Sequence, residues 1–167
     1  VVYTTDGTLT ESEILALGDS NKATYKDGGY SFTLKDEQQV AYYIYAIDNA
    51  GNISEAKTIE VKINKDKPSV DTVKKNPEYD WHNGVVTITG TVSSKANASP
   101  VVKVEYTTDN KIFNEATFNA NEGTYEFTVT DEQNSTYYIY AIDAAGNVSD
   151  AKTIDVRIDA TVPEING

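Results

Sequence analysis

Tyr42–Ile63 reads YYIYAIDNAGNISEAKTIEVKI, and Tyr137–Ile158 reads YYIYAIDAAGNVSDAKTIDVRI, so that 17 of the 22 positions are identical. Four of the five differences, at positions 53, 55, 60 and 62 of the first copy, keep the charge or the apolar character of the residue. The two copies start 95 positions apart (137 − 42). Repeats at a fixed spacing are typical of arrays in which one supersecondary unit is used again. The sequence therefore predicts a tandem array of modules about 95 residues long.

The repeated stretch has the pattern of a β-hairpin. Residues 42–47 are β-branched and aromatic and alternate between two faces, which predicts a strand. Asp48–Asn52 supplies side chains that bond their own backbone, together with a glycine that can take a positive φ, so it predicts a tight turn. Ala56–Ile63 alternates again and predicts the second strand.

A complete module is predicted from about Pro68 to Ile158, and it contains seven short strands. They are expected at Ser69–Val73, Val85–Val92, Val101–Thr107, Ala116–Phe118, Gly123–Val129, Tyr137–Ile142 and Ala151–Ile158. This number of strands, with turn signals between them, is typical of a Greek-key β-sandwich. We therefore predict an all-β fold of tandem immunoglobulin-like Greek-key β-sandwiches. The side chains expected to face the second core are Val86, Ile88, Val102, Val104, Phe127, Ile139, Ala141, Ile154 and Val156.

The repeat also predicts the domain boundaries. Residues 1–65 form a first module, residues 66–160 a complete second one, and residues 161–167 the start of a further one. Val1–Asp6 (VVYTTD) matches Val104–Asp109 (VEYTTD), so the first module is expected to lack its opening strands. We expect those strands to come from outside this sequence. With no methionine, the sequence is expected to be part of a longer chain.

The first module carries an insertion. The stretch between Asp6 and Tyr42 is eight residues longer than its counterpart in the second module. Within it, Thr10 and Glu13 have the spacing of a capping box, and Gly18 stands where a helix would end. The pattern predicts a short helix over Glu11–Leu17, on a loop between strands. A connection without a function of its own is the favoured interpretation, although loops carry binding sites more often than strands do.

The seam between the modules, Asn64–Pro68, is polar, short and free of glycine and serine. Pro68 fixes its own φ and restricts the backbone of Lys67 before it. A proline recurs at the same distance after the second copy of the repeat, at Val162-Pro163. The sequence therefore predicts a preferred relative orientation of the modules with limited bending.

Composition excludes several functional classes. The formal net charge of −12 argues against nucleic acid and anionic membrane surfaces as partners, because both need basic residues. No run of 18 apolar residues is present, so no membrane insertion is expected. With no cysteine, no disulfide and no cysteine-based metal site can form.

Neither catalysis nor a metal site is favoured by the polar residues. His82, the only histidine, has no serine or threonine that the sequence holds against it, so no catalytic residue is expected. Calcium has hard oxygen ligands available at Asp48, Asn49 and Asn52 or at the seam, Asn64 and Asp66. Because the second copy carries Ala144 and Thr161 at the matching positions, a structural turn is the favoured interpretation. We predict that the protein has no metal site and no cofactor and is not an enzyme.

Five segments together resemble a known family. DKPSV at the seam, WHNGVVTITG at 81–90, VEYTTD at 104–109, GTYEFTV at 123–129 and YAIDAAGN at 140–147 are similar to bacterial immunoglobulin-like repeats. These occur in tandem in large secreted and wall-attached proteins of Gram-positive bacteria. The resemblance implies a structural or adhesive spacer, secreted or on the cell surface (cell wall). Its partners would be neighbouring modules of the same polypeptide, and host or wall glycans or proteins.

The tyrosines offer an alternative function. Tyr42 and Tyr137 stand at the position of a tyrosine corner, which is a structural role. The alternation sends four others, Tyr43, Tyr45, Tyr138 and Tyr140, to the opposite sheet face, where solvent is expected. Exposed aromatic rings could stack on sugars, so a glycan-binding module that uses these tyrosines is the alternative to a spacer. Strand propensity and cross-strand packing are the commoner reason for such residues.

Overall fold

The computed structural model describes residues 1–165, and its chain divides into two compact units between Asn64 and Lys65. Both units are built from antiparallel strands, and the only α-helix among the described residues has five residues. The all-β prediction is confirmed. The predicted start of a further module at residues 161–167 extends outside the described residues, and positions 161–165 carry no helix or strand.

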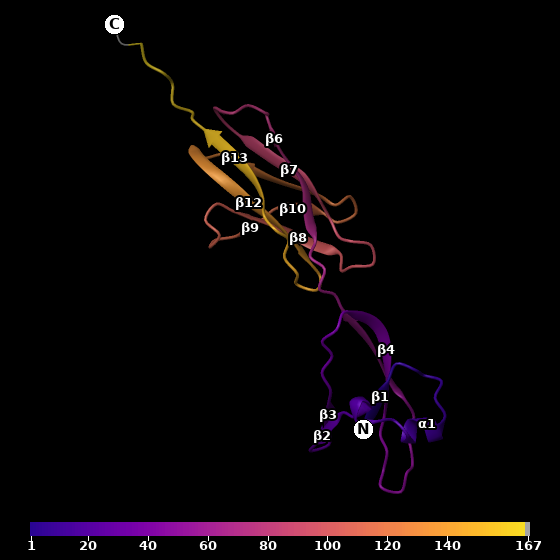
Figure 1. Ribbon diagram of the computed structural model, residues 1–167. Helices are drawn as coiled ribbons and strands as arrows, with labels where there is room; N and C mark the ends of the chain where they lie inside the picture. Colours follow the sequence, from indigo (N-terminus) through magenta and orange to yellow (C-terminus); the bar gives the residue numbers. More distant parts are fainter. Residues whose placement is uncertain (166–167) are drawn as a thin grey trace. The chain divides into compact units, whose positions relative to one another are not determined.

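Unit 2 consists of two four-stranded sheets (Figure 1). The first has the order β10-β11-β7-β6 and the second the order β13-β12-β8-β9. Their bounds are β6 Ser69–Asn76, β7 Val86–Ser93, β8 Val101–Thr107, β9 Asn114–Glu115, β10 Thr117–Asn119, β11 Thr124–Val129, β12 Gln133–Asp143 and β13 Lys152–Ile158. The chain changes sheet after β7, β9 and β11, which is the strand order of an immunoglobulin-type sandwich.

The core of unit 2 lies between these sheets, and the predicted register is confirmed there. Phe127 and Ile139 are buried, whereas Glu126 is exposed and Tyr138 is only half-buried. Seven of the nine predicted core side chains are buried, and Ile154 is half-buried against the same cluster. The seven are Val86, Ile88, Val104, Phe127, Ile139, Ala141 and Val156.

The ninth, Val102, is half-exposed, so that prediction is wrong. The pairing of β8 with β12 is irregular here, because Ile142 lies opposite Lys103 but Asp143 lies opposite Val101. This β-bulge leaves Val102 without a partner and reverses the alternation. Val101 packs against the core in its place.

Gly90 on β7 is a point of close packing between three strands. The Tyr125 hydroxyl reaches across it and donates a 3.0 Å hydrogen bond to the carbonyl oxygen of Thr72. A Cβ atom at Gly90 would overlap both of these oxygens. Burial also raises the pKa of the Tyr125 phenol above its ordinary value, because the charged form would lose its water.

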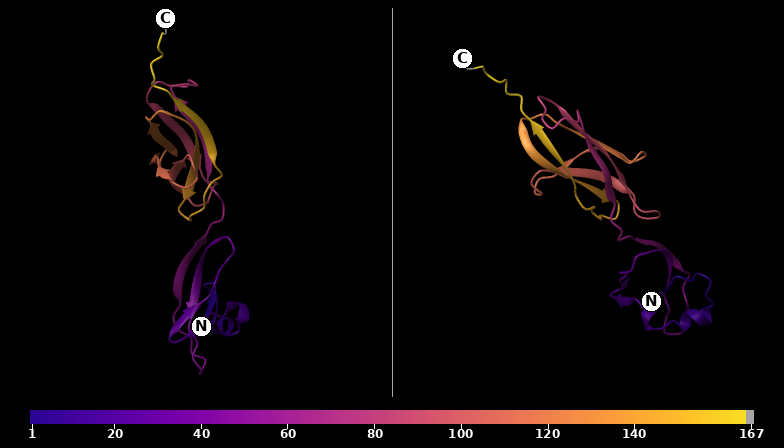
Figure 2. Two further views of the ribbon diagram at one scale, coloured as in Figure 1. Left: turned by 90° about the vertical axis from the view of Figure 1, so that its left-hand side faces the viewer. Right: turned by 45° about the horizontal axis from the view of Figure 1, so that its top comes forward.

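Unit 1 has a three-stranded sheet of order β1-β4-β5 and a separate β2-β3 hairpin. The bounds are β1 Val2–Thr4, β2 Thr24–Lys26, β3 Gly29–Ser31, β4 Gln38–Tyr45 and β5 Lys57–Ile63, with α1 at Glu11–Leu15 and a 3₁₀ turn at Asp19–Asn21. Figures 1 and 2 show α1 on one side of the sheet and the β2-β3 hairpin on the other. The helix is two residues shorter than predicted, and the Glu13 carboxylate accepts a hydrogen bond from the Thr10 backbone N–H as in a capping box.

The inward face of unit 1 is more open than the matching face of unit 2. Among the described residues, unit 1 has no strands that correspond to β6 and β7. Tyr30 is therefore 47% exposed, whereas its counterpart Tyr125 is 2% exposed. Phe32 still stacks on Tyr3, as Phe127 stacks on Tyr106 in unit 2. An apolar groove of about 270 Å³ remains along this face, and Tyr30 and Phe32 line it.

Candidate functional site

The first pair of predicted ligand-binding tyrosines does not face solvent. Tyr45 is buried and Tyr43 is half-buried, and both belong to a cluster with Val2 and Ile14. Ile14 lies on α1, inside the eight-residue surplus. The insertion therefore folds over the outer face of the sheet, because this buries its own apolar side chain together with Tyr45.

The second pair is also partly covered. Tyr138 and Tyr140 are half-buried. The Tyr140 hydroxyl donates a 2.8 Å hydrogen bond to the Asn110 side chain, and its ring meets Phe113 edge-on. The expectation of a solvent-facing ring is therefore wrong for Tyr45, which is buried.

The repeated Asp turn is a hydrogen-bonded structure. In unit 2, the Asp143 carboxylate accepts hydrogen bonds from the backbone of Ala145 and Asn147 and from the Asn147 side chain. In unit 1, Asp48 accepts the corresponding bonds from Ala50 and Asn52. The Asn52 side chain, followed by these backbone N–H groups, lowers the pKa of the Asp48 carboxyl. Among residues 1–165, no group of three or more His, Asp and Glu side chains is placed to hold a metal ion.

A pocket of about 380 Å³ lies in unit 2, in the loop between β6 and β7. Its walls include Tyr79, Trp81, His82 and Asn83, and Asp159 adds a carboxylate from the chain that leaves β13. The loop is tied to this chain by two backbone hydrogen bonds, from His82 N–H to the Arg157 carbonyl and from Asp159 N–H to the His82 carbonyl.

Two aromatic side chains of the pocket, Tyr79 and Trp81, are exposed to solvent. Tyr79 is 69% exposed and Trp81 54% exposed. Arg157 lies beside the Trp81 ring, with its guanidinium carbon 6.0 Å from the ring centre, at the limit of a cation–π contact. Val85 adds a further exposed apolar side chain to the wall.

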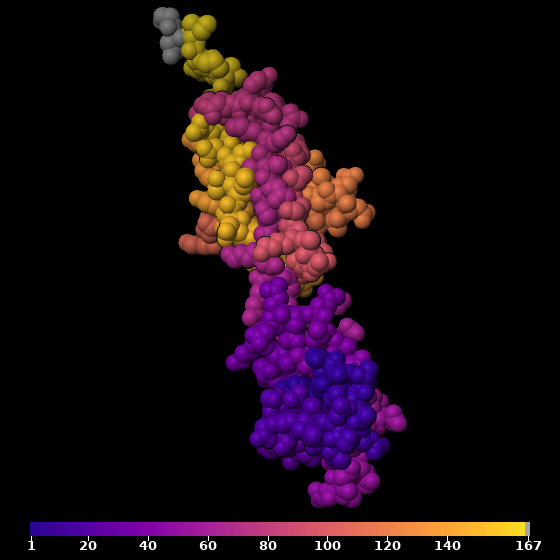
Figure 3. All heavy atoms as spheres, turned by 45° about the vertical axis from the view of Figure 1, so that its right-hand side comes forward, coloured from indigo at the N-terminus to yellow at the C-terminus, as the bar shows by residue number. Residues whose placement is uncertain are grey.

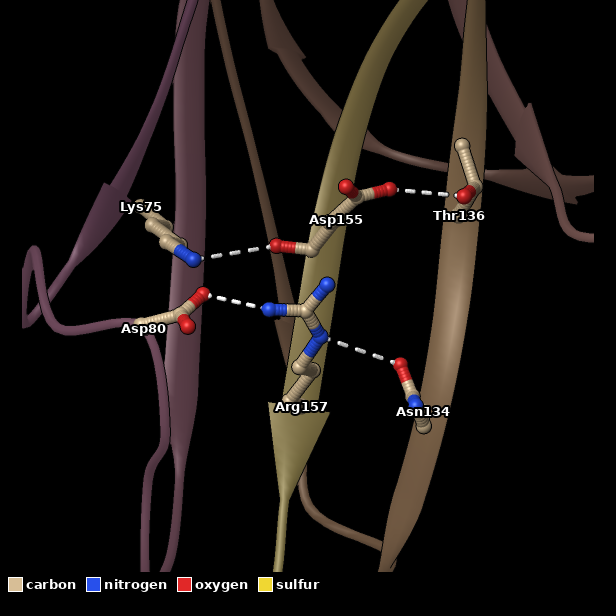
Figure 4. Close-up of polar contacts among 6 residues, drawn as sticks. All are labelled: Lys75, Asp80, Asn134, Thr136, Asp155 and Arg157. Atoms are coloured by element: carbon tan, nitrogen blue, oxygen red, sulfur yellow. Dashed lines mark hydrogen bonds and ion pairs between the residues drawn. The ribbon is translucent and has the colours of Figure 1, made fainter.

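Arg157 is held by partners on both sides, as Figure 4 shows. Its guanidinium donates to the Asp80 carboxylate at 2.7 Å and to the Asn134 side-chain oxygen at 3.2 Å. Lys75 on β6 donates to the backbone carbonyl of Asp155, so the edges of the two sheets are joined here. In the space-filling view, β6 and β13 lie side by side along this surface (Figure 3). The contacts hold the Arg157 side chain beside the Trp81 ring.

His82 is the unusual member of the pocket. It is only 6% exposed, and neither of its ring nitrogens has a hydrogen-bond partner among the described residues. The Tyr79 ring lies beside it, with 6.4 Å between ring centres. Buried polar nitrogens without partners are uncommon in folded proteins and each costs free energy.

Sequence reasoning considered His82 only as a catalytic base and did not identify this pocket. The signal was present, because the only tryptophan and the only histidine are adjacent in the chain. The change from Lys62 to Arg157, one of the five differences between the copies, also falls beneath Trp81.

No protein-family model matches the chain, and no curated protein matches it. Among solved structures, the chain is similar to one titled "Structures of Clostridium thermocellum CbhA fibronectin(III)-like modules". The identity is 19%, the TM-score is 0.48, and the alignment covers 81% of this chain and 70% of that chain. A likeness at this level says nothing about activity, ligand or partners.

Proposed function

We propose that this chain is a non-catalytic structural and adhesive spacer segment of a large extracellular bacterial surface protein. The single observation that supports this function is that the repeated polar residues are used to build the fold. Asp48 and Asp143 make the same turn, as described above. The hydroxyls of Ser54 and Ser149 likewise accept the backbone N–H eight residues earlier, at Ala46 and Ala141.

The repeated tyrosines fit the same proposal. Tyr42 and Tyr137 are buried, and each hydroxyl donates to a glutamine side chain four residues earlier in its strand, at 2.6 Å and 2.9 Å. A repeat that served catalysis would keep side chains that converge on a cleft, whereas this repeat keeps side chains that close turns and fill the core. Its natural partners are then neighbouring modules, and wall or host glycans and proteins at the cell surface. No helix among residues 1–165 is long and apolar enough to cross a membrane.

The spacer proposal is tested by the dimensions of arrays. Proteins with one, two and four copies of residues 66–160 joined head to tail are compared by small-angle scattering. For a spacer with limited bending, the maximum dimension grows in proportion to the number of copies. Growth with the square root of that number, unchanged when Pro68 is replaced by glycine, is the behaviour of a flexible chain and would contradict the proposal.

A further inference from the structure

We propose that the pocket formed by Tyr79, Trp81 and His82 binds the rings of a neutral glycan. This site is independent of the spacer function and lies away from the tyrosines on β4 and β12. Its volume of about 380 Å³ falls within the range of small-molecule sites, which begins near 300 Å³. The occupant that this volume admits is one or two sugar rings.

The aromatic rings supply the apolar half of the site. Trp81 and Tyr79 together with Val85 expose apolar surface on one loop, where folding alone would favour its burial. Tryptophan and tyrosine have a flat apolar face and a polar edge, which suits the face of a pyranose ring and its rim of hydroxyls. The bonds of Arg157 to Asp80 and Asn134 hold its guanidinium in place, 6.0 Å from the centre of the Trp81 ring.

His82 and its neighbours supply the polar half. A neutral imidazole has one donor and one acceptor nitrogen, and here both are without a partner among the described residues. A sugar hydroxyl both donates and accepts, so it can satisfy either nitrogen whichever one carries the proton. Both nitrogens are shielded before a ligand binds, so a side chain of the pocket has to move before a sugar hydroxyl reaches them. Asn83 and Asp159 line the same pocket and offer further groups for hydroxyls.

The charge of the chain selects a neutral ligand. The protein carries a formal net charge of −12, and Asp159 lines this pocket. The cation beside Trp81, Arg157, already forms an ion pair with Asp80. An acidic polysaccharide, a phosphate or a nucleic acid would therefore be repelled, whereas a neutral hexose chain would not.

The experiment uses the single tryptophan and the single histidine as reporters. The whole chain is titrated with cellohexaose and with fully acetylated chitohexaose, and with oligogalacturonate of matched length as the anionic probe. Trp81 fluorescence and the imidazole signals of His82 in NMR spectra are followed together. We expect at least one neutral oligosaccharide to change both signals with the same Kd, and oligogalacturonate to bind at least tenfold more weakly.

Matched substitutions distinguish binding at this site from non-specific binding to exposed aromatic residues. Tyr79→Ala should weaken binding about tenfold, as for aromatic residues at the centre of an interface. Tyr25→Ala removes an equally exposed tyrosine, 63% exposed, from unit 1 and should leave the Kd unchanged. Thermal melts of both variants should match the parent protein, because neither side chain is buried.

Three results would overturn the proposal. One is that neither neutral oligosaccharide, nor any member of a neutral glycan array, changes the His82 and Trp81 signals at millimolar concentration. Another is equal loss of binding in Tyr25→Ala and Tyr79→Ala. The third is a change of both signals with protein concentration alone, since the loop would then be a contact between protein modules. None of these results bears on the array dimensions that test the spacer function.

Discussion

Gly90→Ala should strongly destabilise unit 2, although it adds only one methyl group. The new Cβ would overlap the Thr72 carbonyl oxygen and the Tyr125 hydroxyl, which are joined by a hydrogen bond. Overpacking in a core costs about 1–3 kcal/mol, and loss of a hydrogen bond adds roughly 1 kcal/mol. The expected loss is therefore about 2–4 kcal/mol, which lowers the Tm of a domain of this size by roughly 10–20 °C.

The assay is thermal unfolding followed by Trp81 fluorescence, because the only tryptophan lies in unit 2 and reports on that unit alone. Gly84→Ala is the matched control, since a Cβ at Gly84 meets no atom within 4 Å. If Gly90→Ala melts within about 2 °C of Gly84→Ala, the packing argument is refuted.

A double-mutant cycle identifies the cause. Tyr125→Phe removes the overlapping hydroxyl oxygen and the hydrogen bond to Thr72. By itself it should destabilise unit 2 by about 1 kcal/mol. Combined with Gly90→Ala, it should cost less than the sum of the two single effects, because the hydrogen bond to Thr72 is lost only once. The Cβ still overlaps the Thr72 carbonyl oxygen, so the double variant stays less stable than the parent protein. If the losses in unfolding free energy of the two single variants simply add, the effect of Gly90→Ala does not involve the Tyr125 hydroxyl.

Three other perturbations test the remaining structure. Val156→Ala should lower the free energy of unfolding of unit 2 by about 2 kcal/mol, because the side chain is fully buried. Val61→Ala on the open face of unit 1 should lower that of unit 1 by less than about 1 kcal/mol. Both are measured by hydrogen-exchange protection, and equal losses would contradict the open face. Tyr45→Ala should destabilise unit 1 by about 3 kcal/mol, seen as an earlier loss of its β-sheet circular dichroism, whereas an exposed tyrosine would change nothing. Hydrogen bonds from Ile112, Lys111 and Thr107 lower the pKa of Asp109 below 3.8, so its stabilisation is complete above pH 3.8 and is lost as the pH falls through the lowered folded pKa. Below pH 3.8, the Tm of the parent protein should therefore fall more steeply with pH than the Tm of Asp109→Asn. Parallel plots of Tm against pH would exclude a stabilising role of the Asp109 carboxylate.

Most strands of unit 2 were predictable because alternation, turns and the repeat all point to the same register. The single strand predicted at Ala116–Phe118 is wrong, because the chain changes sheet there and forms two short strands, β9 and β10. Phe127 and Ile139 face the core as the pattern requires. Val102 was not predictable, because a β-bulge depends on the partner strand and leaves no mark in the alternation of its own strand.

The candidate site was less accessible to sequence reasoning. Alternation places Tyr43 and Tyr45 on the outer face correctly, but it cannot say that an inserted helix covers this face. The Trp81 pocket combines a loop with Asp159 on the chain after β13, 78 positions later (159 − 81). Only the fold brings these segments together and buries the ring nitrogens of His82 where no other group of residues 1–165 bonds them.

The near-identity of the two hairpins also matters while the chain is folding. The sheet β10-β11-β7-β6 has two possible partners in one polypeptide, β12-β13 and β4-β5, and the repeated stretches that carry these hairpins differ at only five of 22 positions. The hairpin β4-β5 is synthesised first and belongs to a unit whose inward face is open. It can therefore compete for the sheet before β12-β13 has been synthesised. A hybrid sandwich formed this way would leave β12-β13 outside, with Ile139 and Val156 in water. Misfolding by exchange between neighbours is therefore an inherent hazard of this array, and hydrogen exchange during refolding would detect it as a second, slowly converting population.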